Sequence, residues 1–341
     1  MNLFGRARAR SAAIIDVAAD SVGGACLLMR EGAPPSLLFA ERVPIAPRPG
    51  EAASAALMRA LDTLSGSLVK AGGPTLARAS GSGTPGRILA AVGAPYEEPR
   101  LRLERLHGEQ GSFTFDKSVL LEAMKRGAAE PSGKLLADEA VVATFLDGYR
   151  VRSPWGRKAR RASIVLLSSA VSAVVAEPLA EGLRRTYHTR AIEIASGALA
   201  FCRALQELFP HEDEYIGLVA RGDAATLILV REGVFYAVAT AELAGDPAAA
   251  LLAALGELAA QSPLPHAVFI IAQERREELK NAFADPRFAP IWLSDSPPRL
   301  LPVLPEHLQL SGKLKIEGNV RPDLFLELLA LFCAQPEEPA R

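Results

Sequence analysis

The sequence predicts an α/β protein built in two halves. Two segments about two hundred residues apart, 14–28 and 217–236, each have the pattern of a strand, a turn of small residues and a second strand. Elsewhere, apolar runs of strand length alternate with amphipathic helical patterns, which is typical of a mixed α/β layer. The chain has 341 residues, about half of them apolar, which is enough for two medium-sized cores.

A first unit is expected at residues 11–95, after a basic tail at 1–10. Its nearly continuous apolar runs are typical of strands buried on both faces. The strands of this unit are expected at 12–17, 23–29, 36–44 and 87–92. Apolar residues recur at helical spacing over 51–69, which predicts a crossover helix. The stretch 72–85 is rich in Gly, Ser, Thr and Pro, so we expect a mobile loop.

A second unit is expected at residues 96–167, inserted between the two halves. Its first strand alternates apolar and charged residues, as a half-buried strand does. The strands are expected at 100–106, 139–146, 149–152 and 162–167. Asp116 is well placed to cap a helix over 117–126, because its carboxylate can accept the free amides of the first turn.

The third unit is expected at residues 168–334, before a polar tail at 335–341. It contains the second hairpin, and its other strands are expected at 191–194 and 267–272. Helices are expected at 171–185, 199–208, 247–261, 275–283 and 322–333. Pro178 is an alternative starting point for the first of these helices, since proline is best tolerated in a first turn. The proline-rich segment 286–305 is expected to be irregular.

Composition excludes several function classes. The formal net charge of -1 gives no reason to expect a nucleic-acid partner. No apolar segment approaches the roughly 20 residues that cross a bilayer, so we expect a cytoplasmic protein without a membrane span. Cys26, Cys202 and Cys333 lie far apart in apolar runs and are expected to be reduced core residues. The basic N-terminal tail is expected to be solvated rather than bound to a membrane.

A distinctive motif lies in DGYRVRSPWGRKARRASIVLL, residues 147–167. With its place between the paired hairpins, this stretch resembles the FtsA and PilM branch of actin-like proteins. The positions that match the closing segment of that family's SHS2 module are Gly148, Tyr149, Pro154, Gly156 and Lys158. The resemblance implies an actin-like (ribonuclease H-like) two-half fold with an inserted SHS2-type α+β subdomain. An ordinary hairpin with a Pro-Gly turn is the alternative interpretation.

The resemblance also identifies the two hairpins as vestigial phosphate clamps. In the first, Asp16 stands at the family's Asp-x-Gly pattern, but Ala18 replaces the glycine and Ser21 is the remaining hydroxyl. In the second, aligned on Gly222, the metal-holding aspartate is replaced by Val219.

The rest of the second hairpin departs from the family in the same direction. Thr226 replaces a second acidic residue, and Arg221 stands where the family has a glycine. A carboxylate is normally needed to hold Mg²⁺ beside the phosphates. Asp223 survives in the turn, where stabilising the turn is its expected role rather than binding a metal.

The adenine side of the family's nucleotide site is also weakened. About thirty residues join Tyr236 to Val268, too few for a separate outer subdomain, so that subdomain is expected to be reduced or missing. Ala272, Gln273 and Glu274 stand where the family has a glycine pair. We therefore expect no cofactor, no metal site and no catalytic residues, with binding of ATP and Mg²⁺ as the alternative.

The resemblance implies a non-catalytic cytoplasmic scaffold that binds a cytoplasmic segment of an inner-membrane protein and lies at the membrane through that partner. Type IV pilus assembly, as in PilM-like proteins, is preferred over cell division, because the tail QPEEPAR does not match the basic membrane helix of FtsA-like proteins. The candidate partner-binding residues are Trp155 and Arg157, and self-association is a further expectation. By analogy, the peptide site is expected between the first unit and the insert.

Two rival hypotheses remain. One is a genuine ATP-binding switch with atypical motifs. The other is an unrelated α/β enzyme whose pocket lies beside residues 72–85 and converges on Asp16, His107 or Asp223. The basic run GRKARR at 156–161 is expected to be a solvated turn, with phosphate contact as its alternative.

Overall fold

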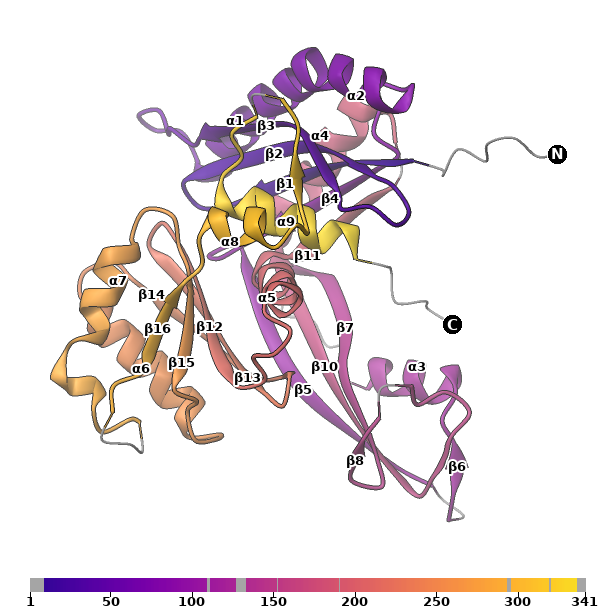
Figure 1. Ribbon diagram of the computed structural model, residues 1–341, viewed down its shortest axis with the longest axis vertical. Coiled ribbons are helices and arrows are strands. Elements are labelled where there is room, and N and C mark those ends of the chain that lie inside the picture. The colour runs from indigo at the N-terminus through magenta and orange to yellow at the C-terminus, as the bar shows by residue number, and fades with distance from the viewer. Residues whose placement is uncertain are drawn as a thin grey trace.

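The computed structural model describes residues 9–108, 111–126, 133–151, 153–189, 191–292, 296–318 and 320–335. Three main sheets organise this part of the chain. Figure 1 shows one sheet at the top, a second at the lower left and the inserted unit projecting at the lower right. Most of the basic tail at 1–10 and of the polar tail at 335–341 lies outside the described residues.

The first sheet has six strands in the order β11-β4-β1-β2-β3-β17. Their bounds are β1 Arg10–Val17, β2 Ser21–Met29, β3 Ser36–Pro44, β4 Arg87–Val92, β11 Ile192–Ser196 and β17 Lys315–Ile316. Alternate residues of β1 enter different cores. Ala13 and Ile15 pack with α1 (Ala53–Ser67) and α4 (Ala173–Tyr187), whereas Ala12 and Ile14 pack with α5 (Gly197–Leu208) and α9 (Leu324–Ala334). The central strands are therefore buried on both faces, as their apolar runs predict.

Two strands of this sheet come from residues assigned to the second half, and of these only the one at 191–194 was expected as a strand. β11 pairs in parallel with β4, and β17 pairs in parallel with β3, so both belong to the first sheet. The C-terminal helix α9 likewise covers the strands of the N-terminal hairpin. Local sequence patterns predict strands and helices but not their partners, because sheet pairing is decided by contacts between distant segments.

The inserted unit has its own sheet in the order β5-β10-β7-β8. The strands are β5 Glu97–His107, β7 Lys134–Leu146, β8 Tyr149–Arg150 and β10 Arg161–Ser172. Helix α3 (Lys117–Lys125) covers one face, and Asp116 caps it by accepting the amides of Ser118 and Val119, as predicted. A two-stranded ribbon of β6 (Phe113–Thr114) and β9 (Lys158–Ala159) completes the distal end.

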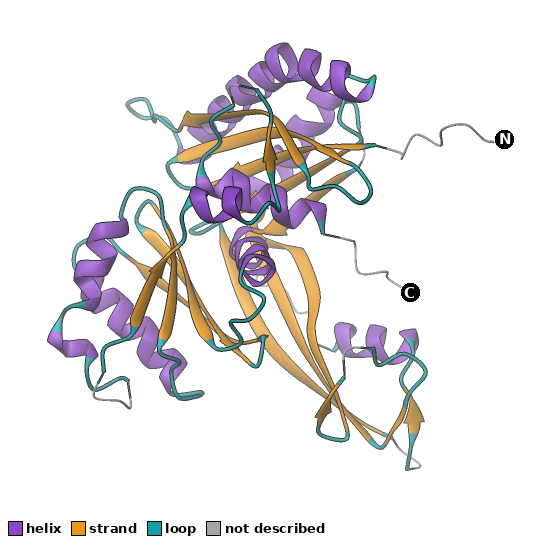
Figure 2. Ribbon diagram, in the orientation of Figure 1, coloured by secondary structure: helices purple, strands orange, loops and turns teal. Residues whose placement is uncertain are grey.

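The second half contains a five-stranded sheet in the order β14-β13-β12-β15-β16. The strands are β12 Tyr215–Arg221, β13 Ala224–Arg231, β14 Val234–Glu242, β15 Ala267–Ile271 and β16 Arg299–Pro302. Helices α6 (Pro247–Ala259) and α7 (Arg276–Phe283) cover its outer face, as Figure 2 shows at the left. Its inner face packs against α5. The segment 217–236 thus contains most of a three-stranded meander rather than one hairpin.

Two local predictions were wrong. The expected mobile loop at 72–85 contains helix α2 (Gly73–Ser80), which follows a short π-helix, η1 (Leu68–Gly72). Pro74 suits the first turn of α2, and Gly81 ends it with a φ of +85°, which favours glycine. Helix α4 begins at Ala173, so Pro178 lies inside it rather than at its start.

The segment expected to be irregular contains a 3-10 turn, η2 (Pro286–Phe288), and strand β16; helix α8 (Pro305–Leu310) follows it. In the described part of the chain, no helix is both long enough and apolar enough to cross a membrane.

Candidate functional site

The two hairpins meet at Asp16. This residue lies near the end of β1 opposite Gly23 and is fully buried. A Cβ atom at position 23 would lie 2.6 Å from Nη2 of Arg42, so Gly23 leaves the space through which the Arg42 guanidinium reaches Asp16. Nη2 of Arg42 lies 2.6 Å from Oδ2 of Asp16. The carboxylate of the first hairpin is therefore in direct contact with an arginine of the neighbouring strand β3.

The second hairpin contributes a guanidinium to the same point. Arg221 is the last residue of β12, and its Nη2 lies 2.6 Å from Oδ2 of Asp16, while Nη1 donates to Oδ1. This bidentate pair is almost wholly buried. The Arg221 guanidinium also lies over the ring of Phe325, with 4.0 Å between Cζ and the ring centroid. Arg221 thus joins the two halves.

Arg42 extends this cluster to the C-terminal helix. Its Nε lies 2.5 Å from Oδ2 of Asp323, which also caps α9, and its Nη1 donates to Oγ of Ser21 at 3.0 Å. Asp16, Asp323, Arg42 and Arg221 balance one another in charge. We call these four residues the interdomain cluster.

The electrostatics of the interdomain cluster follow from its pairing. Burial alone would raise the pKa of Asp16, but the charges of Arg221 and Arg42 hold that pKa below its usual value. Burial alone would lower the pKa of Arg42, but Asp16 and Asp323 raise it. Asp16 and Arg42 are therefore held in their charged forms, and removing a partner would leave an uncompensated buried charge.

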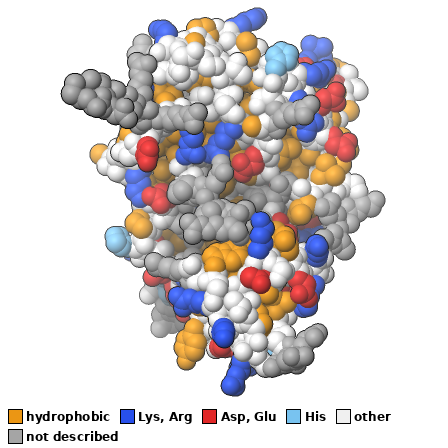
Figure 3. Space-filling view, turned by 90° about the vertical axis from the view of Figure 1, so that its right-hand side faces the viewer, with side chains coloured by type: hydrophobic (Ala, Val, Ile, Leu, Met, Phe, Trp, Pro, Cys, Tyr) orange, Lys and Arg blue, Asp and Glu red, His pale blue; other side chains and the backbone are white. Residues whose placement is uncertain are grey.

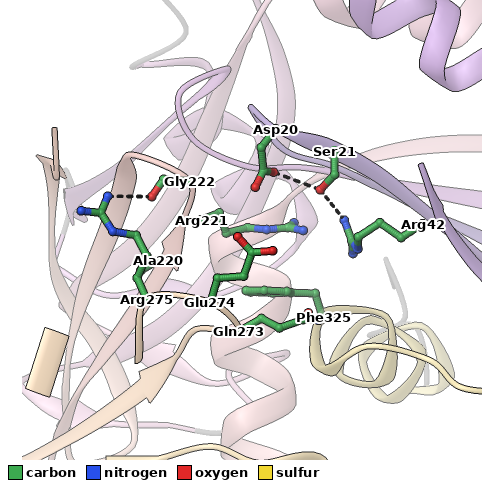
Figure 4. Close-up of a pocket in the computed structure, with 10 residues that line it drawn as sticks. All are labelled: Asp20, Ser21, Arg42, Ala220, Arg221, Gly222, Gln273, Glu274, Arg275 and Phe325. Atoms are coloured by element: carbon green, nitrogen blue, oxygen red, sulfur yellow. Dashed lines mark hydrogen bonds between the residues drawn. The ribbon is translucent and has the colours of Figure 1, made fainter. Parts of the chain in front are cut away.

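The space that remains between the hairpins is small. A cavity of about 50 Å³ lies there, and Figure 4 shows the residues around it, with the side chain of Arg221 extending between the hairpins. Ligand pockets commonly have volumes of about 300–1,000 Å³. The cavity therefore has room for a water molecule or two, and the place where a phosphate clamp would close is filled by the protein's own side chains.

The remaining predicted hairpin residues have separate surroundings. Gly222 has a φ of +53°, and its carbonyl accepts from Nη1 of Arg275 at 3.0 Å. Asp223 is mostly exposed and pairs with the same arginine at 2.8 Å. Thr226 is buried within β13 opposite Val219. The structure thus brings Ser21 and Gly222 to one cavity, buries Asp16 beneath the arginines beside it, and places Asp223 and Thr226 outside the cavity.

Sequence reasoning missed three members of this site, namely Arg42, Asp323 and Phe325. Arg42 and Asp323 are 281 positions apart, so no spacing rule connects them. One local signal was present: Asp323 precedes an apolar helical run, which identifies it as a helix N-cap. The arginine in an otherwise apolar third strand was a second, weaker signal.

The predicted partner residues lie at the distal end of the insert. The rings of Trp155 and Phe115 meet edge to face with centroids 5.6 Å apart, so Trp155 packs on its own hairpin while 38% of its surface stays exposed. Arg157 is exposed beside it. The structure contains no partner, so a binding role for this pair stays a prediction.

A larger cavity lies between the insert and the second sheet. It has a volume of about 900 Å³ and is lined by residues of β5, β10 and β14. Leu103 and Tyr236 face it from opposite sides and are 47% and 49% exposed. At its far end, Arg150 donates to the carbonyl of Glu232 and connects the two walls. We call this cavity the insert groove. It differs from the expected site between the first unit and the insert.

Comparisons with known proteins bear on the fold. No family model matches the chain, and no curated protein matches it. Among solved structures, a chain of the "PilM-PilN type IV pilus biogenesis complex" is similar, with a TM-score of 0.59 and 15% identity, over 95% of this chain and 99% of that chain. A Bacteroides thetaiotaomicron protein "with actin-like ATPase fold and unknown function" has a TM-score of 0.49 and 9% identity, over 97% and 98% of the two chains.

The first of these similarities extends over nearly the whole of both chains. At this identity, it bears on the fold and not on the activity. The expected resemblance to PilM-type proteins is therefore confirmed for the fold. Two finer expectations stay predictions: that the insert is an SHS2 module and that the outer subdomain is reduced. The chain has the actin-like fold that its paired hairpins predict.

Proposed function

We propose that this protein is a non-catalytic, actin-like scaffold that binds a cytoplasmic segment of an inner-membrane protein in a type IV pilus machine. The observation that carries the non-catalytic part is the Arg221 guanidinium, which lies between the two hairpins in contact with Asp16. The similarity to a chain of the PilM–PilN complex supports the pilus assignment over cell division. In this proposal the protein lies at the inner face of the membrane through its partner.

Three features support the absence of a nucleotide reaction. Asp16, the buried carboxylate of the first hairpin, is neutralised by two arginines instead of facing a metal. Val219 replaces the second carboxylate and is buried in β12. The cavity of about 50 Å³ is too small for a triphosphate.

The insert groove is the proposed partner site. Its walls carry apolar side chains from two edge strands, β5 and β14, each of which pairs with a neighbour on one side only. An extended peptide can hydrogen-bond to such an edge while its alternate side chains fill apolar pockets. The two predicted residues Trp155 and Arg157 do not line this groove, so in this proposal the peptide does not contact them.

Calorimetric titration with ATP and Mg²⁺ tests the non-catalytic part. We expect no binding tighter than about 100 μM. Saturable, Mg²⁺-dependent binding below that value would instead support the rival hypothesis of an ATP-binding switch.

Fluorescence anisotropy with labelled peptides tests the partner site. The peptides would tile the cytoplasmic segment of the PilN-type protein from the same cell. Leu103→Asp should abolish binding of the active peptide, because it places a charge on the apolar wall. Val69→Asp is the matched control, since Val69 is also 47% exposed but lies on η1, away from the groove. Equal losses in both variants would remove the groove from the proposal.

A further inference from the structure

The distal end of the insert carries a dense group of basic side chains. Five exposed residues contribute to it: Arg105, Arg157, Lys158, Arg160 and Arg161. None of the five has an ion pair with any residue in the described part of the chain. Figure 3 shows blue Lys and Arg side chains at the lower end of the molecule, which is the same end of the insert in Figure 1. We call these five residues the basic tip.

This lack of pairing contrasts with the ion pairs of many other arginines. Many arginines outside the basic tip bind carboxylates, including Arg42, Arg59, Arg100, Arg102, Arg221, Arg231, Arg275 and Arg287. Close to the basic tip, the carboxylate of Asp147 accepts the backbone amides of Arg160 and Arg161, each at 2.9 Å, and not their guanidinium groups. The part of the chain that the structure describes therefore leaves the charges of the tip without a carboxylate partner.

The backbone beneath these side chains is held in place along its length. The carbonyl of Arg157 accepts the amide of Phe115 at 2.8 Å, and the carbonyl of Arg160 accepts the amide of Gly108 at 3.1 Å. Lys158 and its neighbour pair with β6. We expected this segment to be a solvated turn. Its backbone is instead hydrogen-bonded to neighbouring segments, which presents its side chains in a fixed arrangement. Fixing the backbone beforehand lowers the entropy that binding must overcome.

Two exposed aromatic side chains accompany the charges. Tyr149 is 78% exposed in the short turn that Asp147 begins, and Trp155 lies two residues before Arg157. Tyrosine and tryptophan are enriched where proteins meet the headgroup region of a membrane. Guanidinium groups bind phosphate oxygens in a bidentate manner. The tip thus combines the two kinds of side chain that recognise a phospholipid surface.

The shape of the tip favours a surface over a peptide. Figure 1 shows that the insert projects away from both halves of the molecule, so its end is unobstructed. Neither of the two cavities described above is lined by a residue of 155–161. A peptide needs a groove or a sheet edge to be held, whereas a membrane surface needs only accessible charge and aromatic side chains.

We propose that the basic tip docks on a membrane surface that contains anionic phospholipid. This contact is independent of the proposed partner and would still form if the partner assignment failed. With a partner bound in the insert groove, it would give the scaffold a second attachment to the same membrane.

Vesicle flotation with the full chain tests the proposal. We expect binding to phosphatidylcholine vesicles that contain phosphatidylglycerol and no binding to phosphatidylcholine alone. Raising the salt from about 0.05 M to about 0.5 M should release the protein, because the Debye length shortens. Absence of binding to the anionic vesicles, or equal binding to both kinds, would overturn the proposal.

A charge-removal variant locates the contact. Its substitutions are Arg157→Gln, Lys158→Gln, Arg160→Gln and Arg161→Gln. We expect the lipid concentration for half-maximal binding to rise roughly tenfold or more. The matched control removes the same charge at exposed sites elsewhere, through Arg30→Gln, Lys70→Gln, Arg184→Gln and Arg185→Gln, and should bind as the wild type does. Circular dichroism checks that both variants are folded.

Two further variants separate the remaining contributions. A chain without residues 2–8 lacks Arg6 and Arg8 and should keep its binding to the vesicles. If this shortened chain loses binding while the tip variant keeps it, the contact belongs to the N-terminal tail. Tyr149→Ser keeps every charge and should weaken binding about twofold or more. Unchanged binding in Tyr149→Ser would remove the aromatic part of the proposal.

Discussion

The interdomain cluster offers a direct test of how the two halves are held together. Arg221→Met keeps an unbranched apolar stem but removes the guanidinium group and its charge. Asp16 would then share Arg42 with Asp323, which leaves one negative charge uncompensated in a buried site. Removing one partner of a buried pair typically costs about 3–5 kcal/mol. We therefore expect Arg221→Met to lower the free energy of unfolding by about that amount at pH 7.

Denaturation in guanidinium chloride at several pH values measures this effect. Because Asp16 has a lowered pKa in the folded wild type, its ion pairs stabilise the fold above the unfolded pKa near 3.8. That contribution is lost as the pH falls through the folded-state pKa. In Arg221→Met the burial of Asp16 is less compensated, so its pKa should rise. The difference in stability between wild type and variant should therefore shrink on acidification from about pH 7 to about pH 4.5.

The control is Arg299→Met. Arg299 pairs with Glu212 at 3.4 Å, and both side chains are largely exposed, so its removal should change stability by at most about 1 kcal/mol. If Arg221→Met costs no more than Arg299→Met, or if its cost does not depend on pH, the buried pair does not stabilise the fold in the way argued. Both variants make the same Arg→Met change. The difference between their effects on stability therefore reports on burial of the charge.

Two further predictions concern single buried positions. Gly23→Ala should destabilise the fold by about 1–3 kcal/mol, because the new Cβ would displace the guanidinium of Arg42. The control is Gly66→Ala in α1, which has open space around it and should stabilise the fold by about 0.5–1 kcal/mol. Thermal unfolding measures both changes. Burial raises the pKa of Glu97 to about 7, although its carboxylate accepts the amide of Ala198 at 3.0 Å. The folded state therefore binds this proton more tightly than the unfolded state does. The free energy of unfolding should fall by about 3 kcal/mol as the pH rises from about 4.5 to about 7. Glu97→Gln should remove this part of the pH dependence, and an unchanged profile would contradict the assignment.

The paired hairpins show how far local patterns reach. Apolar runs and small-residue turns predicted β1 and β2, β12 and β13, and most of the helices between and after them, since these signals depend on residues close in the chain. The cap at Asp116 was predicted for the same reason. Helix α2 was missed because glycine and proline were taken as loop residues, although Pro74 and Gly81 mark its two ends.

The candidate site was only partly accessible from the sequence. The loss of the second carboxylate at Val219 was visible, and so was the unusual Arg221. The partner that Arg221 finds was not visible, because Asp16 lies 205 positions away. The expected groove beside the first unit also depended on analogy, whereas the larger described cavity lies beside β14.

The sequence by itself determined most of the secondary-structure elements of this protein, because hydrophobic periodicity and residue type act locally. Only the tertiary structure decided that Arg221 closes the space between the hairpins and that α9 brings Asp323 to Arg42. It alone also showed that the backbone of residues 156–161 is hydrogen-bonded to neighbouring segments and that the basic side chains on it have no ion pair among the described residues. Such contacts join segments that are far apart in the chain, and their partners are set by how the sheets and helices pack.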